Sequence, residues 1–357
     1  MYALIVAGGE GKRFWPLSKR DKPKQFLSLV GGRSMIRGTV DRVLPLIPIE
    51  NVFIVTLERY ADETLKHIPE IPQSNLILEP EGKNTAPAIA LGTLKIKKSD
   101  SDAVTIVLPA DHAIGEEDAF RDVLLFGGSV ANTRLPNGDF PLVTLGIRPI
   151  RPETGYGYIK EAEVIEVSEK YRVKRVQGFT EKPDLKTASQ FLEEGRYYWN
   201  SGIFIWRAST ILDSFHRLLP DWYKSFDKIM IDINTPRERA TIIEFYRQVE
   251  PGPIDKLILE RSQNTVVIPV DFPWNDLGSW QALDEFLRND LEENIFRGEG
   301  ISIDSSGCLV FGGNRPIAIV GVRDLVVVDS GDAILVIDKQ KAQDVKKVVE
   351  TIEKKEK

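Results

Sequence analysis

The stretch Leu4–Gln25, LIVAGGEGKRFWPLSKRDKPKQ, contains the strongest structural signal in the chain. It opens with four apolar residues that favour a buried strand. Glycines follow at positions 8, 9 and 11, and six lysines and arginines lie between positions 12 and 24. A glycine-rich turn after a strand brings backbone N–H groups close to a ligand, and nearby cations attract polyphosphate. The stretch therefore predicts a nucleoside triphosphate site.

Two common phosphate-binding motifs do not fit this turn. A Walker A loop would need glycine where the chain has Val6, and serine or threonine in place of Arg13. A dinucleotide fingerprint starting at Gly9 would need a third glycine where Phe14 stands, and phenylalanine is too bulky for that close packing. A plain glycine turn with solvated lysines is the ordinary alternative.

The fixed positions of this stretch resemble the signature of the sugar-1-phosphate nucleotidyltransferases, in which a sugar phosphate attacks the α-phosphorus of a nucleoside triphosphate. The matching pattern is Gly8-Gly9-x-Gly11-x-Arg13-x-x-Pro16-Leu17, followed by Lys22-Pro23-Lys24. The resemblance implies that Arg13 holds the β- and γ-phosphates and that Lys24 neutralises the α-phosphate and the incoming sugar phosphate. It also implies a nucleotide-binding turn made of Ala7, Gly8, Gly9, Gly11 and Lys12.

Composition limits the remaining possibilities. The chain has 357 residues, of which 42% are hydrophobic, so it is long enough for a large core. A net charge of −6 argues against nucleic-acid binding. Cys308 is the only cysteine, and the three histidines are far apart, so cysteine or histidine zinc sites are not expected. We expect a cytoplasmic protein without a membrane partner, because the sequence lacks a long apolar run and a basic leader.

Beyond the first strand, strand and helix signals alternate. Residues 52–55, 75–78 and 103–108 read as strands, and residues 86–97 read as a helix. This alternation predicts an α/β fold with a mixed, mostly parallel, Rossmann-like sheet flanked by helices. Ligands in such folds gather at the carboxyl ends of the strands.

Two aspartates are candidate metal ligands. Asp111 follows the strand at 103–108, and Asp276 lies in the aromatic segment Phe272–Trp280. Local rules alone would make Asp111 a helix cap and Asp276 a turn residue. Magnesium that accompanies nucleotide phosphates needs only one or two protein carboxylates. The resemblance implies that Asp111 and Asp276 converge on one Mg²⁺.

Glu79 is the candidate for base selection. Guanine presents two adjacent donors, and a carboxylate at a strand end can accept from both. The segment Glu-Pro-x-x-x-Asn-Thr-Ala-Pro-Ala at 79–88 resembles the guanylyltransferases of this family that act on mannose 1-phosphate. Asn84 and Thr85 are then nucleotide-binding candidates, although Asn84 or Thr85 could equally be a helix cap.

Later loops should bind the sugar phosphate. The resemblance implies that Gly157 lets the backbone approach the hexose, that Glu181 accepts from its hydroxyls, and that Lys182 binds its phosphate. Asn200 follows in a small polar turn before an apolar strand, and its amide suits hydroxyl recognition. Read alone, these residues would be an ordinary tight turn and a solvated pair.

The C-terminal part differs in kind. Residues 299–338 consist of short β-rich pieces separated by Gly and Ser, and residues 341–353 read as a helix. We expect a catalytic domain at 1–288 and a small domain at 289–357, which the resemblance implies is a short left-handed β-helix used for self-association as a homodimer. Some relatives carry a cupin domain that isomerises mannose 6-phosphate with histidine metal ligands, and we expect this chain to have one activity rather than two.

The resemblance predicts the transfer of GMP from GTP to α-D-mannose 1-phosphate, giving GDP-mannose and pyrophosphate. A phosphate monoester is already ionised near neutral pH, so the reaction needs no general base. Three alternatives remain: another hexose 1-phosphate or base, a non-catalytic regulatory homologue, and a glycosyltransferase with an Asp-x-Asp metal site, whereas Asp111 lies in Pro-Ala-Asp-His.

Overall fold

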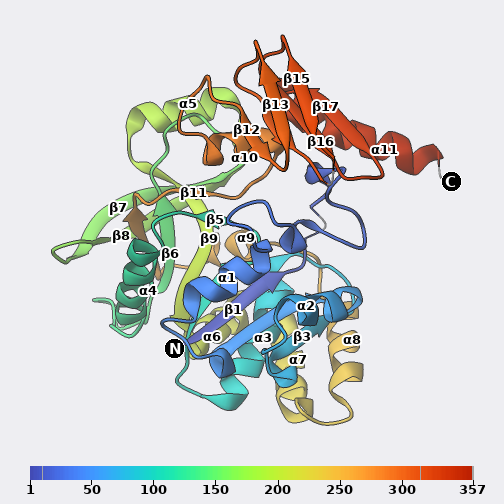
Figure 1. Cartoon of the computed structure of the whole chain (residues 1–357). Helices are drawn as coiled ribbons and strands as arrows, with labels where there is room; N and C mark the ends of the chain where they lie inside the picture. Colours follow the sequence, from blue (N-terminus) through green and yellow to red (C-terminus); the bar gives the residue numbers. More distant parts are fainter. Residues whose placement is uncertain (10, 314, 356–357) are drawn as a thin grey trace. The chain divides into compact units, whose positions relative to one another are not determined.

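The computed structural model describes residues 1–9, 11–313 and 315–355. The chain divides into two compact units. The first contains residues 1–8, 39–110 and 114–272, and the second contains residues 9–38, 111–113 and 273–357. In the glycine turn, Gly8 therefore belongs to the first unit and Gly9 to the second. Figure 1 shows the helices and strands of both units.

The first unit is built on a nine-stranded sheet with the order β3-β2-β1-β4-β9-β6-β10-β8-β7 (Figure 1). Strands β1 to β4 pair in parallel, β6 pairs in parallel with β10, and the other pairings are antiparallel. Seven of the nine strands therefore run in one direction, with β8 and β9 reversed, which agrees with the expected mixed, mostly parallel sheet. The strand bounds are β1 Tyr2–Ala7, β2 Val52–Leu57, β3 Leu76–Glu79, β4 Val104–Pro109, β6 Leu142–Ile147, β7 Gly157–Val167, β8 Arg172–Glu181, β9 Tyr197–Arg207 and β10 Thr265–Val270.

Helices cover both faces of this sheet. Phe204 and Trp206 of β9 belong to a large buried cluster that also includes side chains of helices α3 and α6. Ile205, between them, points to the other face, where a β-carbon on Gly127 of α4 would lie 2.4 Å from its Cδ1. This is the alternation expected of a strand buried on both sides. The helix bounds are α2 Ala61–His67, α3 Thr85–Ser99, α4 Glu117–Ala131, α5 Leu185–Glu194, α6 Ala208–Leu218, α7 Pro220–Asp232, α8 Glu238–Gln248 and α9 Ile254–Leu257.

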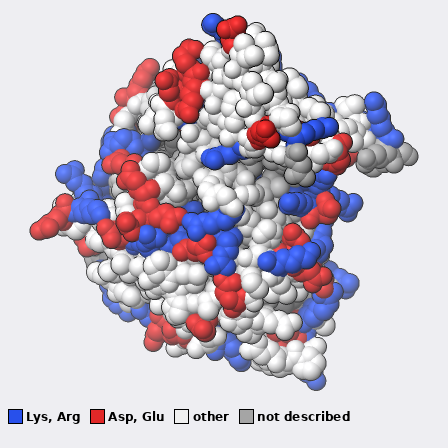
Figure 2. Space-filling view, in the orientation of Figure 1, with Lys and Arg blue, Asp and Glu red and all other residues white. Residues whose placement is uncertain are grey.

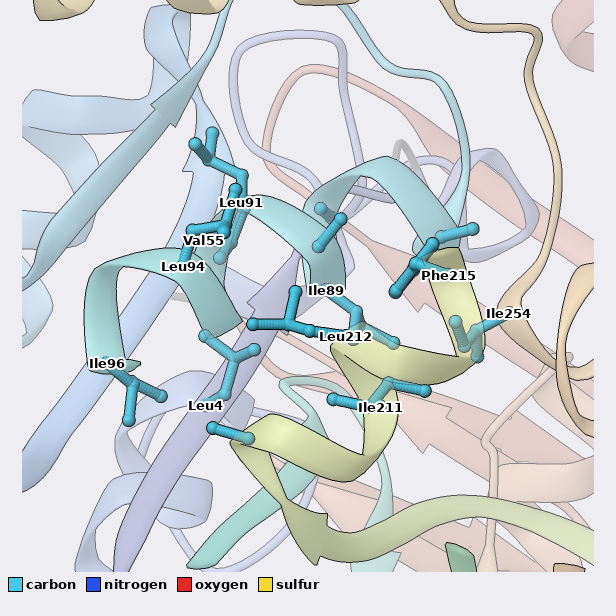
Figure 3. Close-up of a cluster of buried hydrophobic side chains, with 14 of the residues drawn as sticks. Leu4, Val55, Ile89, Leu91, Leu94, Ile96, Ile211, Leu212, Phe215 and Ile254 are labelled. Atoms are coloured by element: carbon cyan, nitrogen blue, oxygen red, sulfur yellow. The ribbon is translucent and has the colours of Figure 1, made fainter. Parts of the chain in front are cut away.

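The large buried cluster is close-packed around α3. Figure 3 shows Leu4 of β1, Leu91 and Leu94 of α3, and Leu212 and Phe215 of α6 in this cluster. Each such side chain contributes about 1.5–3 kcal/mol when it is fully buried. The cluster thus holds β1 and β4, whose carboxyl ends precede the predicted functional residues.

The second unit contains coils of parallel strands. Strands β12, β14 and β16 pair in parallel, and β13 pairs in parallel with β15. Ile295 pairs with Leu309 and Leu309 with Val326, so successive coils are 14 and 17 residues long. This is the expected β-helix-like arrangement, and its left hand stays a prediction. The bounds are β12 Ile295–Arg297, β13 Gly300–Ile303, β14 Leu309–Phe311, β15 Ile317–Val320, β16 Leu325–Asp329 and β17 Ile334–Asp338, the last antiparallel to β16.

Neighbouring residues of the coils face two different cores. Leu309 and Phe311 of β14 pack with Phe14 and Trp280, whereas Val310, between them, packs inside the coil with Cys308. The coils therefore form one hydrophobic core with the segment that carries Arg13. The remaining elements are α1 Met35–Val43, β5 Ala113–Ile114, β11 Trp274–Asn275, α10 Trp280–Leu287, α11 Val345–Lys355 and short 3₁₀ helices at 12–14, 24–26, 49–51, 58–60, 73–75, 259–261 and 339–344.

Two sequence predictions of local structure need correction. Asn200 was expected in a small polar turn before an apolar strand, but it lies within β9, where the pairing with β6 shifts register and Gly202 has a φ of +69°. The C-terminal helix begins at Val345, because residues 339–344 form a 3₁₀ helix. In a sequence, glycine and short polar residues next to apolar ones predict a turn. A β-bulge contains the same residue types but depends on strand pairing, which the sequence does not show.

Charges of both signs are interspersed over the face that Figure 2 shows. Among residues 1–9, 11–313 and 315–355, no helix has the length and apolar character needed to cross a bilayer.

Candidate active site

In the first unit, the end of β1 lies beside the end of β3. A β-carbon at Gly8 would lie 3.3 Å from Oε2 of Glu79, and the Ala7 carbonyl accepts from the Thr56 hydroxyl at 3.1 Å. The parallel order β3-β2-β1 places these carboxyl ends at one edge of the sheet. The predicted neighbours Ala7, Gly8 and Glu79 are thus brought together.

Glu79 is buried, with 2% of its surface exposed. The Tyr246 hydroxyl donates to its Oε1 at 2.8 Å. Burial raises the pKa of Glu79 to about 7, although the hydrogen bond from Tyr246 opposes this rise. The carboxyl group can therefore gain or lose a proton near neutral pH.

Asn84 and Thr85 have structural partners. Asn84 is the N-cap of α3, and its Oδ1 accepts from the Thr85 backbone N–H at 2.8 Å. Its φ of +70° is a left-handed conformation that asparagine tolerates better than most residues. The Thr85 hydroxyl accepts from the backbone N–H of Ile254 at 2.9 Å. The helix-cap reading is correct for Asn84, and a nucleotide contact for either residue stays a prediction.

A second cluster in the first unit joins three strands and α9. Gly157 starts β7 opposite Glu181, the last residue of β8, and a β-carbon there would lie 2.7 Å from Glu181 Oε2 and 3.6 Å from Asn200 Cβ. Asn200 donates from Nδ2 to Asp255 Oδ2 at 3.2 Å, and its Oδ1 lies 3.4 Å from the Thr144 hydroxyl. Gly157, Glu181 and Asn200 therefore lie together, as predicted for a sugar site.

Lys182 stands at the rim of this cluster. Its ammonium pairs with Glu181 Oε1 at 2.7 Å, and its side chain is 63% exposed. A φ of +46° turns the chain sharply after β8. This exposed ammonium is free to exchange its carboxylate partner for a phosphate at little cost, since exposed pairs are worth less than about 1 kcal/mol.

In the second unit, Lys24 joins the two aspartates. It is 5% exposed, its Nζ lies 2.8 Å from Asp111 Oδ2, and it also donates to the backbone carbonyl of Asp276. Asp276 Oδ1 accepts from the backbone N–H of Gly278 at 2.9 Å, which forms a tight turn. The structure therefore brings Lys24, Asp111 and Asp276 together.

Asp111 is not a helix cap, because the element that follows it is the short strand β5. Burial alone would raise the pKa of its carboxyl group, but the Lys24 ammonium, with His112, holds that pKa below its usual range. Asp111 is therefore ionised at neutral pH and is suited to bind a cation.

Arg13 is held by the same turn. Its Nη1 donates to the Gly278 carbonyl at 2.9 Å. Next to it, Phe14 packs edge-on against Trp280 with 4.9 Å between the ring centroids, and Trp280 Nε1 donates to the Trp15 carbonyl at 3.1 Å. These buried contacts fix the start of the basic stretch against α10.

The glycines of the turn have different surroundings. Gly11 has a φ of +59°, and a β-carbon there would lie 2.5 Å from the Lys24 β-carbon, so only glycine fits. Gly9 is exposed, with open space where a β-carbon would lie. The Lys12 side chain lies outside the described part of the structure. The backbone therefore passes close to Lys24 at Gly11. At Gly9 the backbone is accessible to a ligand.

The donor set suits a hard divalent cation. Lys24 contacts the carboxylate of Asp111 and the backbone carbonyl of Asp276, and Asp276 adds a second carboxylate to the cluster. Within residues 1–9, 11–313 and 315–355, no group of three or more His, Cys, Asp or Glu residues could hold a metal ion. One or two protein carboxylates plus substrate phosphates are what Mg²⁺ usually takes in nucleotide enzymes. The residues therefore fit a metal that arrives with the nucleotide.

Sequence reasoning missed two partners of the predicted residues. Tyr246 lies in α8 and bonds Glu79, and Asp255 lies in α9 and bonds Asn200. Tyr246 was hidden among the apolar residues of an amphipathic helix. Asp255 carried one usable signal, since a carboxylate in the Pro251-Gly-Pro-Ile-Asp255 turn is flanked by chain-stiffening residues.

The comparisons with known proteins agree with this fold. A family model described as nucleotidyl transferase matches residues 2–293. A second model, described as MannoseP isomerase/GMP-like beta-helix domain, matches residues 298–352. The chain belongs to the nucleotidyl transferase family.

Within this family, the chain is similar to mannose-1-phosphate guanylyltransferases. It is 38% identical to the mannose-1-phosphate guanylyltransferase of Escherichia coli strain K12, over 99% of this chain and 73% of the relative. It is 37% identical to the xanthan biosynthesis protein XanB of Xanthomonas campestris, over 98% of this chain and 72% of the relative. A crystal structure from Thermus thermophilus, titled mannose-1-phosphate geranyltransferase, is 33% identical and superposes with a TM-score of 0.88 over 99% of each chain.

Proposed function

We propose that this chain transfers GMP from GTP to α-D-mannose 1-phosphate, giving GDP-mannose and pyrophosphate. The observation that carries the proposal is the contact of Lys24, which lies against Gly11, with both Asp111 and the Asp276 backbone. It supplies a buried cation and two carboxylates, which phosphoryl transfer between two anions requires. The 38% identity to mannose-1-phosphate guanylyltransferases supports the choice of substrates.

The reaction is a direct displacement. A phosphate oxygen of mannose 1-phosphate attacks the α-phosphorus of GTP, the bond from that phosphorus to the bridging oxygen of the β-phosphate breaks, and pyrophosphate leaves with the electron pair. The attacking phosphate is already ionised, so no residue has to remove a proton. The obstacles are repulsion between the anions and alignment of the attacking oxygen.

The cations of the second unit remove the repulsion. Lys24 neutralises the α-phosphate and the attacking sugar phosphate, and Arg13, with the amides of Gly8, Gly9, Gly11 and Lys12, holds the β- and γ-phosphates that depart as pyrophosphate. Because Arg13 is already bonded to the Gly278 carbonyl, its guanidinium is oriented before substrate binds. Positioned charges of this kind lose little free energy to reorganisation during the reaction.

Asp111 and Asp276 would hold Mg²⁺. The ion supplies charge neutralisation for the triphosphate and the leaving pyrophosphate. The low pKa of Asp111 keeps its carboxylate ready for the cation. Lys24, which pairs with Asp111, would then also be within reach of phosphate oxygens.

Base and sugar recognition fall to residues of the first unit. Glu79, in its ionised form, accepts from the N1–H and 2-amino groups of guanine, and adenine offers no such pair of donors. Asn84 and Thr85 shape the loop beside it. Gly157, Glu181 and Asn200 contact the hexose, and Lys182 binds the sugar phosphate.

We further propose a catalytic domain at 1–288 and a β-helix-like domain at 289–357 that supports a homodimer. Exposed apolar side chains on the coils, among them Ile301, Ile303 and Val320 at 51–60% exposure, support a role in association. GTP and hexose phosphates are cytoplasmic metabolites, so we place the reaction in the cytoplasm.

The test is a matrix of substrate pairs. Pyrophosphate release is measured with Mg²⁺ for GTP, ATP, UTP and dTTP, each with mannose 1-phosphate, glucose 1-phosphate or no sugar. We expect pyrophosphate release with GTP and mannose 1-phosphate together to be at least tenfold faster than with every other pair. A tenfold difference corresponds to the loss of about 1.4 kcal/mol of interaction free energy in each mismatched pair. Faster release with another pair would overturn the assigned specificity, and no release with any pair would favour a non-catalytic homologue.

A further inference from the structure

Asn200 donates a hydrogen bond to the carboxylate of Asp255. Within residues 1–9, 11–313 and 315–355, no other carboxylate is described as accepting from this side chain. Asp255 Oδ2 accepts from Asn200 Nδ2 at 3.2 Å. The other end of that amide is held as well, since Asn200 Oδ1 accepts from the Gly202 backbone N–H at 3.3 Å and lies 3.4 Å from the Thr144 hydroxyl. These contacts fix which end of the amide is donor and which is acceptor.

The segment that leads into Asp255 is anchored by three hydrogen bonds to the start of α3 and the residue Lys83 before it. The Gly252 N–H donates to the Lys83 carbonyl at 3.1 Å, and the Gly252 carbonyl accepts from the Ala86 N–H at 3.0 Å. The Ile254 N–H donates to the Thr85 hydroxyl at 2.9 Å. Asp255 is therefore held by backbone that cannot move without breaking these bonds.

Other charges surround Asp255. Glu181 and Glu260 oppose its ionisation, and Lys182 favours it. Burial, with those two carboxylates, raises the pKa of Asp255 to about 6. Burying an ionisable carboxyl group costs free energy that a neutral side chain of the same size would not. Its presence here therefore indicates a function.

We propose that Asp255 is a positioning and specificity-determining residue for the sugar: it locks the amide of Asn200 so that the remaining amide hydrogen meets one fixed hydroxyl of the hexose. This inference rests on the proposed function and assigns Asp255 to its sugar subsite. Hexose epimers differ only in the direction of one hydroxyl, so an amide free to flip would bind both. The ionised form holds the amide more firmly, because charge-assisted hydrogen bonds are the stronger ones.

The kinetic test uses Asp255→Ala. We expect the KM for mannose 1-phosphate to rise about tenfold, as for one lost hydrogen bond to a charged group, while the KM for GTP and the kcat change by less than about twofold. The preference for mannose 1-phosphate over glucose 1-phosphate should fall by a similar factor. Unchanged KM for the sugar phosphate, or equal changes for both substrates, would overturn the proposal.

Two further variants separate positioning from a general loss of charge or of structure. Asp255→Asn resembles the protonated carboxyl group, so the ratio of its sugar KM to that of the wild type should fall towards one below pH 6. The titration of the substrate itself cancels in that ratio. Glu260→Gln is the matched control, because it removes a carboxylate from the same surroundings without contact to Asn200 and should leave the sugar KM within about twofold. A ratio independent of pH, or an equal effect of Glu260→Gln, would contradict the role of Asp255.

A binding measurement keeps this inference distinct from the proposed reaction. Calorimetric titration of wild type and Asp255→Ala with mannose 1-phosphate needs no turnover. Wild-type binding that weakens about tenfold in the variant supports the role of Asp255 even if no GDP-mannose is formed. Equal binding by both proteins would refute it while leaving the guanylyl transfer standing.

Discussion

The Nζ atom of Lys24 lies 2.8 Å from Asp111 Oδ2, in a site where only 5% of the lysine is exposed. A buried ion pair of this kind is costly to form and is weak evidence for stability. In the proposed mechanism, Lys24 would be available to a phosphate if a metal ion bound the Asp111 carboxylate.

Removing that cation should stop the reaction while the protein stays folded. We expect Lys24→Met to lower kcat by about 100- to 1000-fold, the usual loss for one positioned electrostatic group. Lys19→Met is the control, because Lys19 lies in the same basic stretch but pairs with the exposed Asp332. Initial rates of pyrophosphate release measure both variants. A Lys24→Met enzyme with near wild-type kcat would remove Lys24 from the mechanism.

Glu79 should make stability depend on pH. In the folded protein the pKa of Glu79 is about 7, above the ordinary value of 4.5. The contribution of Glu79 to the free energy of unfolding is therefore fully present below about pH 4.5 and is lost as the pH rises through 7. Between pH 5 and pH 8.5 the wild type should lose up to about 3 kcal/mol of unfolding free energy relative to Glu79→Gln. Urea denaturation at the two pH values measures this difference. Tyr246→Phe should enlarge it, because the Tyr246 hydroxyl lowers that pKa; parallel curves for Glu79→Gln and wild type would contradict the account.

The same residue predicts a proton linked to nucleotide binding. If guanine binds to the ionised Glu79, GTP affinity should increase as the pH rises from 6 to 8, and binding should release a proton near pH 7. Calorimetry of GTP binding in buffers of different ionisation enthalpy counts that proton. Binding of GTP without proton release, and with affinity independent of pH, would exclude Glu79 as the reader of the base.

Much of this architecture could be predicted from sequence. The strand-turn pattern at Leu4–Gln25 and the β-rich C-terminal part led to the correct fold class, because glycine and apolar periodicity act locally. The partners Tyr246 and Asp255 could not be predicted, since each meets its target only through sheet order and loop packing. Asn200 was placed in a turn for the same reason: the bulge that turns its side chain arises from pairing with β6.

A substitution at Gly157 tests whether Gly157 and Glu181 act together in the predicted sugar site. Gly157→Ala places a β-carbon 2.7 Å from Glu181 Oε2, so that carboxylate must shift. We expect the KM for the sugar phosphate to rise about tenfold, corresponding to about 1.4 kcal/mol. Gly178→Ala, in the neighbouring strand β8 with open space at its β-carbon, is the control. Equal kinetics of the two variants would separate Gly157 from the sugar site.

Removing one partner of a buried charge cluster should destabilise the second unit. Asp284 is 4% exposed and pairs with Lys339 at 2.8 Å and with Arg288 at 3.0 Å. Asp284→Ala leaves two buried cations without their partner and should cost about 3–5 kcal/mol of unfolding free energy. Thermal or urea unfolding measures this loss. The exposed Asp221, paired with Lys224, is the control, and Asp221→Ala should cost less than about 1 kcal/mol; equal losses for the two variants would show that burial does not matter here.

In the proposed reaction, GMP passes directly from GTP to the sugar phosphate. A single-turnover experiment with GTP labelled at the α-phosphorus, excess enzyme and Mg²⁺, quenched with and without mannose 1-phosphate, tests it most directly. Direct transfer should give label in GDP-mannose only when mannose 1-phosphate is present, and none attached to the protein. Label bound covalently to the protein without the sugar phosphate, or no labelled GDP-mannose with it, would rule out direct transfer.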